Sequence, residues 1–183
     1  MEIILFFVLA FAGFVIFLNV QKRLIEYLEK FEENDVDNMK KLIVYQGIQG
    51  SGKTTAAKAF VMEDPDNRVR VNRDDIRLML GKQFNPKIER LVTDIEEAAL
   101  EAAMAMGKTV VSDNMNMNPK TISFLKGLAG DFGYEIEYRF IYTPLEECIE
   151  RDSKRPNPVG EKVIRRTYNT YQDFIEKHNP EKK

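Results

Sequence analysis

The sequence contains few of the side chains on which disulfide and metal chemistry depend. Its 183 residues include one cysteine, Cys148, and one histidine, His178. A single cysteine excludes an internal disulfide framework and a cysteine-based metal site. Cys148 falls in an amphipathic helical pattern, which is typical of a buried structural thiol. His178 lies near the charged C-terminus, and we interpret it as a surface residue and not as a catalytic base.

The sequence also lacks a strong net charge of either sign. The formal net charge is −2, from 27 Lys and Arg against 29 Asp and Glu. Residues 1–38 carry three basic and seven acidic side chains, whereas residues 39–183 carry 24 and 22. A broad basic surface of the kind that binds nucleic acid nonspecifically is therefore absent, and any nucleic-acid binding has to come from a local cluster.

Only one long hydrophobic run occurs, and it lies at the N-terminus. Ile3–Leu18 is an unbroken series of apolar residues followed by a basic pair, close to the length of about 20 residues that spans a bilayer. Glu2 and the lack of an A-x-A site after the run disfavour a signal peptide, and the missing polar face disfavours a core helix. The run predicts a transmembrane anchor over residues 1–20, embedded through residues 3–20, in a single-pass membrane protein whose C-terminal part is cytoplasmic.

The residues after this run predict a stalk and one larger domain. Apolar residues at helical spacing indicate a helical stalk or linker over residues 21–38, and residues 39–183 form the expected domain. Strands are expected at 41–46, 68–71, 108–112 and 134–142. Helices are expected at 53–63, 85–107, 118–130, 144–153 and 160–177. This alternation predicts an α/β fold with a parallel sheet of about four strands flanked by helices.

A phosphate-binding motif follows the first expected strand. The sequence GIQGSGKT at residues 47–54 matches G-x-x-x-x-G-K-[ST], in which glycines let backbone N–H groups surround a phosphate. Lys53 is expected on the β- and γ-phosphate oxygens, and the Thr54 hydroxyl on Mg²⁺. This predicts a P-loop NTPase fold that binds ATP and Mg²⁺ but does not separate a kinase from a GTPase or a motor. The expected ATP-binding residues here are Gly47, Gly50, Ser51, Gly52, Lys53, Thr54 and Thr55.

Two carboxylates follow the next strands, at the edge of the sheet where ligands bind. In NRDDIR (72–77), Asp74 is placed to accept the proton of an acceptor hydroxyl, and Arg77 to hold a neighbouring anion. Helix capping by Asn72 or Asp74 explains the same residues equally well. Asp113, after the third strand, is a candidate for Mg²⁺ or for the acceptor, or begins an Asx turn.

A basic cluster with proline and glycine comes later in the chain. In RDSKRPNPVG (151–160), Arg151 and Arg155 are spaced one helical turn apart, and Pro156, Pro158 and Gly160 follow. Such a segment is typical of a lid that brings arginine onto transferring phosphates. A solvated run of charges is the alternative.

Together, GIQGSGKT, NRDDIR, SDNMN with the following NP, and RDSKR resemble the kinase domain of bacteriophage-type 5′-polynucleotide kinases over about residues 40–172. The resemblance implies that Lys53 and Thr54 bind ATP phosphates and Mg²⁺, and that Asp74 is the general base on a 5′-hydroxyl. It also implies that Arg77 holds the phosphate 3′ to the reacting nucleotide. Asp113 would help to organise the acceptor site, Arg155 would close on the ATP phosphates, and Arg151 would lie by the nucleobase or phosphates.

The resemblance therefore favours an enzyme that phosphorylates 5′-OH ends of DNA or RNA. A small-molecule kinase for nucleosides or sugars is an alternative, because the charge of the domain is nearly neutral. A membrane-tethered ATP-binding regulatory module is another, although such a module needs no acceptor base. The sequence identifies no protein partner.

Overall fold

The computed structural model describes residues 21–22, 40–81 and 84–180. The chain divides into two units, residues 1–39 and 40–183. Of the first unit only Gln21 and Lys22 are described, and both are helical. The rest of the predicted stalk lies outside the described residues, so the predicted domain boundaries stay a prediction.

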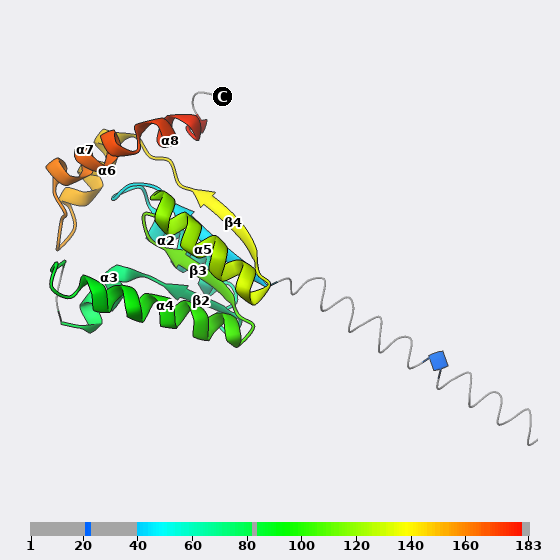
Figure 1. The fold of residues 1–183 in the computed structure, drawn as a ribbon. Coiled ribbons are helices and arrows are strands. Elements are labelled where there is room, and N and C mark those ends of the chain that lie inside the picture. The colour runs from blue at the N-terminus through cyan, green and yellow to red at the C-terminus, as the bar shows by residue number, and fades with distance from the viewer. Residues whose placement is uncertain (1–20, 23–39, 82–83, 181–183) are drawn as a thin grey trace, which may run out of the picture. The chain divides into compact units, whose positions relative to one another are not determined.

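A parallel sheet of four strands forms the centre of the second unit (Figure 1). The strands run in the order β2-β3-β1-β4, and every neighbouring pair is parallel. Their bounds are β1 Lys41–Gln46, β2 Arg68–Val71, β3 Thr109–Asp113 and β4 Glu135–Phe140. This confirms the α/β fold and the parallel sheet that the sequence predicts.

Helices cover both faces of the sheet because successive strand side chains point to opposite sides. In β1, Leu42 and Val44 pack with α4 and α5, whereas Ile43 and Tyr45 pack with α2. The third apolar cluster joins Ile48 to the C-terminal helices. The helices are α2 Lys53–Met62, α3 Arg73–Met79, α4 Glu89–Ala105, α5 Pro119–Phe132, α6 Leu145–Ser153, α7 Glu161–Thr170 and α8 Gln172–Lys177.

Three helix ends differ from the predicted ones for local reasons. Residues 85–88 form a turn, in which Ile88 N–H donates to the Asn85 carbonyl at 2.9 Å, so the predicted helix 85–107 begins at Glu89. The last predicted helix is divided at Tyr171 into α7 and α8. Helix α5 continues past Gly130 and ends at Gly133, whose φ of +68° is the left-handed conformation that commonly ends a helix.

The prediction of a transmembrane helix as part of this fold is corrected. Among residues 21–22, 40–81 and 84–180, no helix is both long and apolar enough to cross a membrane. The longest of them, α4, has 17 residues and carries charged side chains along its length, and it is about 25 Å long at 1.5 Å per residue. The run at residues 1–20 lies outside the described residues. The structure thus supports the α/β P-loop fold with no spanning helix in the part of the chain that it describes, and it does not support the predicted membrane localisation.

Candidate active site

The predicted phosphate-binding loop connects β1 to α2 and packs tightly against the segment that follows β4. Gly47, Gly50 and Gly52 have φ values of +144°, +81° and +98°, which side chains other than glycine rarely adopt. A Cβ atom on Gly47 would lie 2.7 Å from the carbonyl oxygen of Ile141, and one on Gly50 would overlap the backbone of Cys148. The glycines are therefore required both by the turn and by the close approach of a second chain segment.

Lys53 begins α2, and the surroundings of its ammonium group shift its pKa. Its Nζ donates to the Ile48 carbonyl at 2.6 Å and to Ser51 Oγ at 3.4 Å. Burial lowers the pKa of Lys53 to about 8, the negative charges of Asp113 and Asp74 raise it, and the positive charge of Arg155 lowers it. Three residues that the sequence places on separate segments thus act electrostatically on one ammonium group.

Thr54 and Asp113 bring a hydroxyl and a carboxylate together. Thr54 Oγ1 donates to Asp113 Oδ1 at 3.3 Å, and Asp113 is fully buried at the end of β3. Asp113 Oδ2 accepts from Arg70 Nη1 at 2.5 Å and from Asn72 Nδ2 at 3.3 Å. The carboxylate is thus fixed on one side by a cation and an amide, and its other oxygen faces the phosphate-binding loop.

Asp74 and Arg77 lie on the first turns of α3, after β2. Asn72 accepts from the Asp75 N–H at 3.0 Å, so the cap of this helix is Asn72 and Asp74 is left with an exposed carboxylate. Arg77 Nη1 donates to Asp74 Oδ1 at 2.5 Å, and its Nε and Nη2 donate to the two Glu89 oxygens at 2.9 and 2.8 Å. Asn72 therefore caps α3, and the Asp74 carboxylate is not used for capping.

The predicted lid segment follows α6 and is anchored by a buried carboxylate. Arg151 Nη1 lies 3.5 Å from the Gly50 carbonyl and 3.4 Å from Thr143 Oγ1, so it contacts the phosphate-binding loop. Arg155 is half exposed, and its nearest carboxylate is Asp152 at 3.8 Å. Asp152 accepts the Gly160 N–H at 2.9 Å, which closes the loop between α6 and α7.

Sequence reasoning missed several residues that support this site. Arg70 lies in β2 and Glu89 begins α4, and the residues next to them in the sequence do not indicate which charged side chain each one pairs with. Asn116 adopts φ +47° and donates to the Tyr45 and Ser112 carbonyls, each at 3.0 Å, which ties the loop after β3 to the end of β1. Its place in the SDNMN block was the only signal, because asparagine tolerates the left-handed conformation better than most residues.

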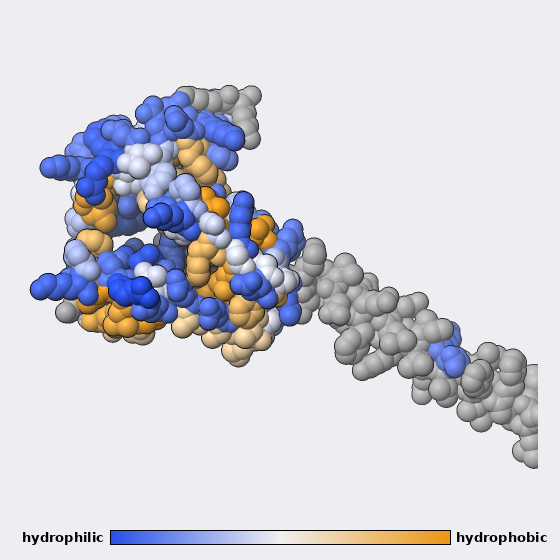
Figure 2. Space-filling model, in the orientation of Figure 1, coloured by the Kyte–Doolittle hydropathy of each residue, from blue (hydrophilic) through white to orange (hydrophobic). Residues whose placement is uncertain are grey.

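The surroundings of these residues are concave. Figure 1 places α3 and α4 on one side of the carboxyl edge of the sheet and α6 and α7 on the other. Figure 2 shows a hollow in the surface between these two parts of the unit. The clustered charges therefore lie at the edge of the sheet where doubly wound α/β proteins bind ligands.

The comparisons with known proteins agree with this geometry. A family model described as an AAA domain matches residues 42–178. A protein of Autographa californica nuclear polyhedrosis virus named "Putative bifunctional polynucleotide kinase/RNA ligase" is 29% identical over 150 residues, covering 72% of this chain and 21% of the viral protein.

Solved structures of other proteins share the fold of this chain. A chain of the Pnkp1/Rnl/Hen1 RNA repair complex is 29% identical, with a TM-score of 0.66 over 77% of this chain and 47% of the other. AvrRxo1-ORF1:-ORF2 with ATP shares the fold at 20% identity and a TM-score of 0.56, over 76% of this chain and 50% of the other. The chain thus spans about a fifth of the viral relative and about half of the repair-complex chain.

The P-loop fold implies nucleotide binding, and the predicted resemblance to polynucleotide kinases is confirmed by these two relatives. The family model covers well over half of the chain, from β1 to the end of α8. This chain belongs to the AAA domain family of P-loop proteins.

Proposed function

We propose that this chain transfers the γ-phosphate of ATP to the 5′-hydroxyl of a polynucleotide end. The hydroxyl oxygen forms a bond to the γ-phosphorus, and the bond between that phosphorus and the oxygen bridging to the β-phosphate breaks. The hydroxyl proton passes to a carboxylate, and ADP leaves. Residues 39–183 are the proposed kinase domain.

One observation carries the proposal: the phosphate-binding loop contacts both sides of the site. Thr54 Oγ1 donates to Asp113 at 3.3 Å, Arg151 of α6 lies 3.5 Å from the Gly50 carbonyl, and α3 exposes the Asp74 carboxylate after the neighbouring strand. A nucleotide switch needs the donor loop but has no use for a carboxylate beside it that can accept a proton. The relatives named as polynucleotide kinase and Pnkp1 support the choice of a polynucleotide acceptor.

The proposed roles follow from position. The loop N–H groups with Gly47, Gly50, Ser51, Gly52 and Thr55 surround the ATP phosphates, and Lys53 neutralises their charge. Asp74 is the general base, since its carboxylate is exposed and oriented by Arg77. Arg77 keeps N–H groups beyond those given to Glu89 and Asp74, and these bind the phosphate next to the reacting nucleotide.

The lid arginines and Asp113 complete the proposed site. Arg155 is half exposed and weakly paired, so it is free to close on the transferring phosphate, and Arg151 binds the nucleotide beside the loop. Asp113 organises the acceptor side through its bonds to Arg70 and Asn72.

Mg²⁺ fits the Thr54–Asp113 pair. A hydroxyl and a carboxylate oxygen 3.3 Å apart are ligands that Mg²⁺ prefers, and this ion commonly uses only one or two protein groups besides phosphate and water. When bound, Mg²⁺ neutralises charge on the phosphates. Thr54 is therefore the proposed protein ligand, with Asp113 beside it.

The test is phosphate transfer by the full-length chain. The protein is incubated with γ-labelled ATP, Mg²⁺ and 5′-OH DNA or RNA oligonucleotides, beside nucleosides and sugars. We expect label on the oligonucleotides. Label on nucleosides or sugars alone would instead identify a small-molecule kinase, and no label on any acceptor would contradict the proposal.

The assignment of the base has its own test. Asp74→Asn should reduce transfer by at least a hundredfold, because general-base catalysis contributes about 10²–10⁴-fold, while ATP binding is retained. Asp131→Asn, on the exposed surface of α5, is the matched control and should leave turnover unchanged. Undiminished turnover of Asp74→Asn would show that another group accepts the proton.

A further inference from the structure

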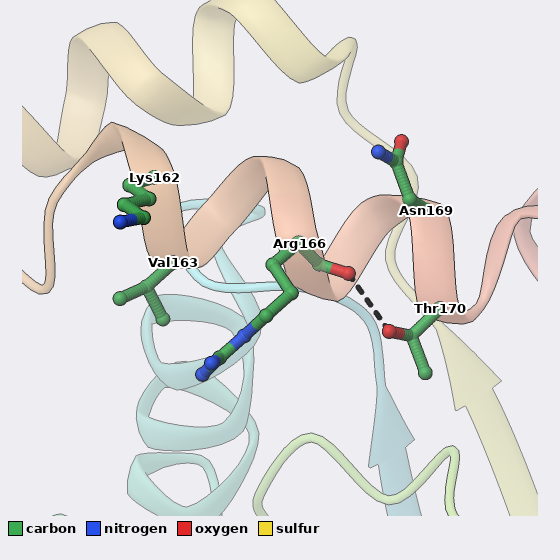
Figure 3. A pocket seen from close by; sticks show the side chains of 5 residues that line it. All are labelled: Lys162, Val163, Arg166, Asn169 and Thr170. Atoms are coloured by element: carbon green, nitrogen blue, oxygen red, sulfur yellow. Dashed lines mark hydrogen bonds between the residues drawn. The ribbon is translucent and has the colours of Figure 1, made fainter.

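One face of α7 lines a cavity of about 600 Å³ that is separate from the phosphate-binding loop itself. The lining residues are Lys162, Val163, Arg166, Asn169 and Thr170. Figure 3 shows their side chains projecting from one helix, with the Arg166 guanidinium extended away from it. Lys162 and Arg166 are four residues apart and thus lie on the same face, about 6 Å apart along the helix axis.

The charge of Arg166 is not neutralised within the described part of the chain. Every other arginine in residues 40–81 and 84–180 has a carboxylate oxygen within 4.0 Å. The preceding Arg165 shows the contrast, because it pairs with Glu146 and Glu161 on the other side of α7. Arg166 and Lys162 therefore give the cavity two positive charges with no acidic partner among the described residues.

The two uncharged polar side chains of this face differ in how their donors are used. The Thr170 hydroxyl donates to the Arg166 carbonyl at 2.8 Å, so it is used within the helix (Figure 3). Within residues 40–81 and 84–180 the Asn169 amide has no such bond, and in Figure 3 it projects away from the Arg166 guanidinium. A guanidinium and an ammonium one helical turn apart suit phosphate oxygens.

The position of α7 connects this face to the candidate active site. Ile164, on the adjoining side of the helix, packs with Ile48 of the phosphate-binding loop. Helix α7 begins at Glu161, directly after Gly160, where the segment carrying Arg155 ends. The α6–α7 part of the surface also borders the hollow that faces α3, which carries Asp74 (Figure 2).

We propose that Lys162 and Arg166 bind backbone phosphates of the acceptor strand downstream of its 5′ end. The inference rests on the proposed function, because it assigns a second contact region to the same substrate. It also explains how a domain with almost no net charge distinguishes a polynucleotide from a nucleoside. Phosphorylation of a 5′ end involves only the first nucleotide, whereas contacts of this face with further phosphates raise the affinity for a longer strand.

The test compares long and minimal acceptors with the full-length chain. In a Lys162→Gln/Arg166→Gln variant, we expect KM for a 5′-OH 12-mer to rise about tenfold at constant kcat. KM for a nucleoside 3′-monophosphate should stay unchanged. The slope of log(kcat/KM) against log salt for the 12-mer should become shallower by about 1.4, since each lost contact to a single strand removes about 0.7.

Two controls keep the test specific. Lys162→Arg/Arg166→Lys keeps both charges and should restore the KM of the 12-mer, which a merely structural role would not predict. Lys120→Gln/Lys126→Gln removes two charges from α5, outside this cavity, and should change nothing. Equal KM values and equal salt slopes for the α7 variant and the unmodified chain would overturn the inference. A chain that phosphorylates no polynucleotide at all would overturn the proposed function itself.

Discussion

Arg77 and Glu89 form a two-point ion pair that joins α3 to α4. Arg77 Nε and Nη2 donate to Glu89 Oε1 and Oε2 at 2.9 and 2.8 Å, and both side chains are largely buried. Donating these hydrogen bonds to Glu89 raises the pKa of Arg77, and accepting them lowers the pKa of Glu89. A planar guanidinium held along one edge keeps a fixed direction for its remaining N–H groups, and one of these contacts Asp74.

Glu89 is therefore expected to position Arg77 and Asp74 for catalysis. Glu89→Gln keeps the shape of the side chain but replaces one acceptor oxygen with a donor, which opposes an arginine N–H. We expect kcat/KM for 5′-OH oligonucleotides to fall about tenfold, which corresponds to about 1.4 kcal/mol. Steady-state kinetics with varied acceptor measures this, and the Kd of ATP should not change.

Asp94→Asn provides the matched control for this prediction. Asp94 also pairs with an arginine, Arg90, but on the exposed face of α4, where such pairs contribute little. It should retain full activity. If Glu89→Gln retained full kcat/KM as well, the ion pair would have only a structural role.

The fold could be predicted from the sequence because its signals are local. The strand β1 is a short apolar run whose predicted bounds match the observed ones, as do those of β2. The phosphate-binding loop is fixed by glycine positions that side chains would obstruct. The sequence does not define the helix α3, since its seven residues give too little periodicity to distinguish a helix from a turn.

The candidate site could be predicted only in part, because its supporting contacts join distant segments. The sequence places Asp74, Arg77 and Asp113 after successive strands, but it does not reveal that Arg70 lies 2.5 Å from Asp113. Glu89 lies 12 residues from Arg77 across a turn. The packing of α4 against α3 determines which acidic side chain pairs with Arg77. That packing cannot be predicted from the neighbouring residues in the sequence.

Gly50 should be intolerant of even the smallest side chain. Gly50→Ala combines a strained φ of +81° with a methyl group that overlaps the Cys148 backbone, so the loop has to move away from α6. We expect ATP binding to weaken at least tenfold and transfer to be lost. Isothermal titration with a nonhydrolysable ATP analogue measures the affinity.

Gly130→Ala is the control that separates strain from a general effect of the substitution. Gly130 lies within α5, and a Cβ atom there meets nothing within 4 Å. Alanine should raise the free energy of unfolding by about 0.5–1 kcal/mol through its better helix propensity. ATP affinity should be unchanged, and an equal loss in both variants would contradict the steric explanation.

Cys148 should be chemically inert in the folded protein. It is fully buried behind the phosphate-binding loop, and burial raises the pKa of its thiol to about 11. At pH 8 the thiolate that reacts with alkylating agents is therefore scarce as well as inaccessible. Because this is the one cysteine of the chain, mass spectrometry after iodoacetamide treatment reports it directly.

We expect no adduct on the native protein within an hour at pH 8 and complete reaction in denaturant. The raised pKa also gives a sign for stability: the contribution of this thiol is fully present below about pH 9 and is lost as the pH rises towards 11. Rapid labelling of the native protein would contradict both the burial and the pKa shift.

Asp152 should control the order of the segment that carries Arg155. Its buried carboxylate accepts the Gly160 N–H at 2.9 Å and the Val159 N–H at 3.3 Å. Asp152→Ala leaves both donors without this acceptor, at a cost of about 1–3 kcal/mol, which corresponds to a loss of several degrees in Tm. A thermal melt and thermolysin cleavage mapped within residues 153–160 measure the effect.

The kcat of Asp152→Ala tests whether this carboxylate positions Arg155 for catalysis. If Arg155 acts on the transferring phosphate, loosening its segment should lower kcat more than it changes the Kd of ATP, because charge stabilisation there is needed most in the transition state. Asp173→Asn, an exposed residue on α8, should alter neither Tm nor kcat. A stability loss in Asp152→Ala with an unchanged kcat at 10 °C would show that the carboxylate holds the loop without positioning Arg155, and the lid role would then require another anchor.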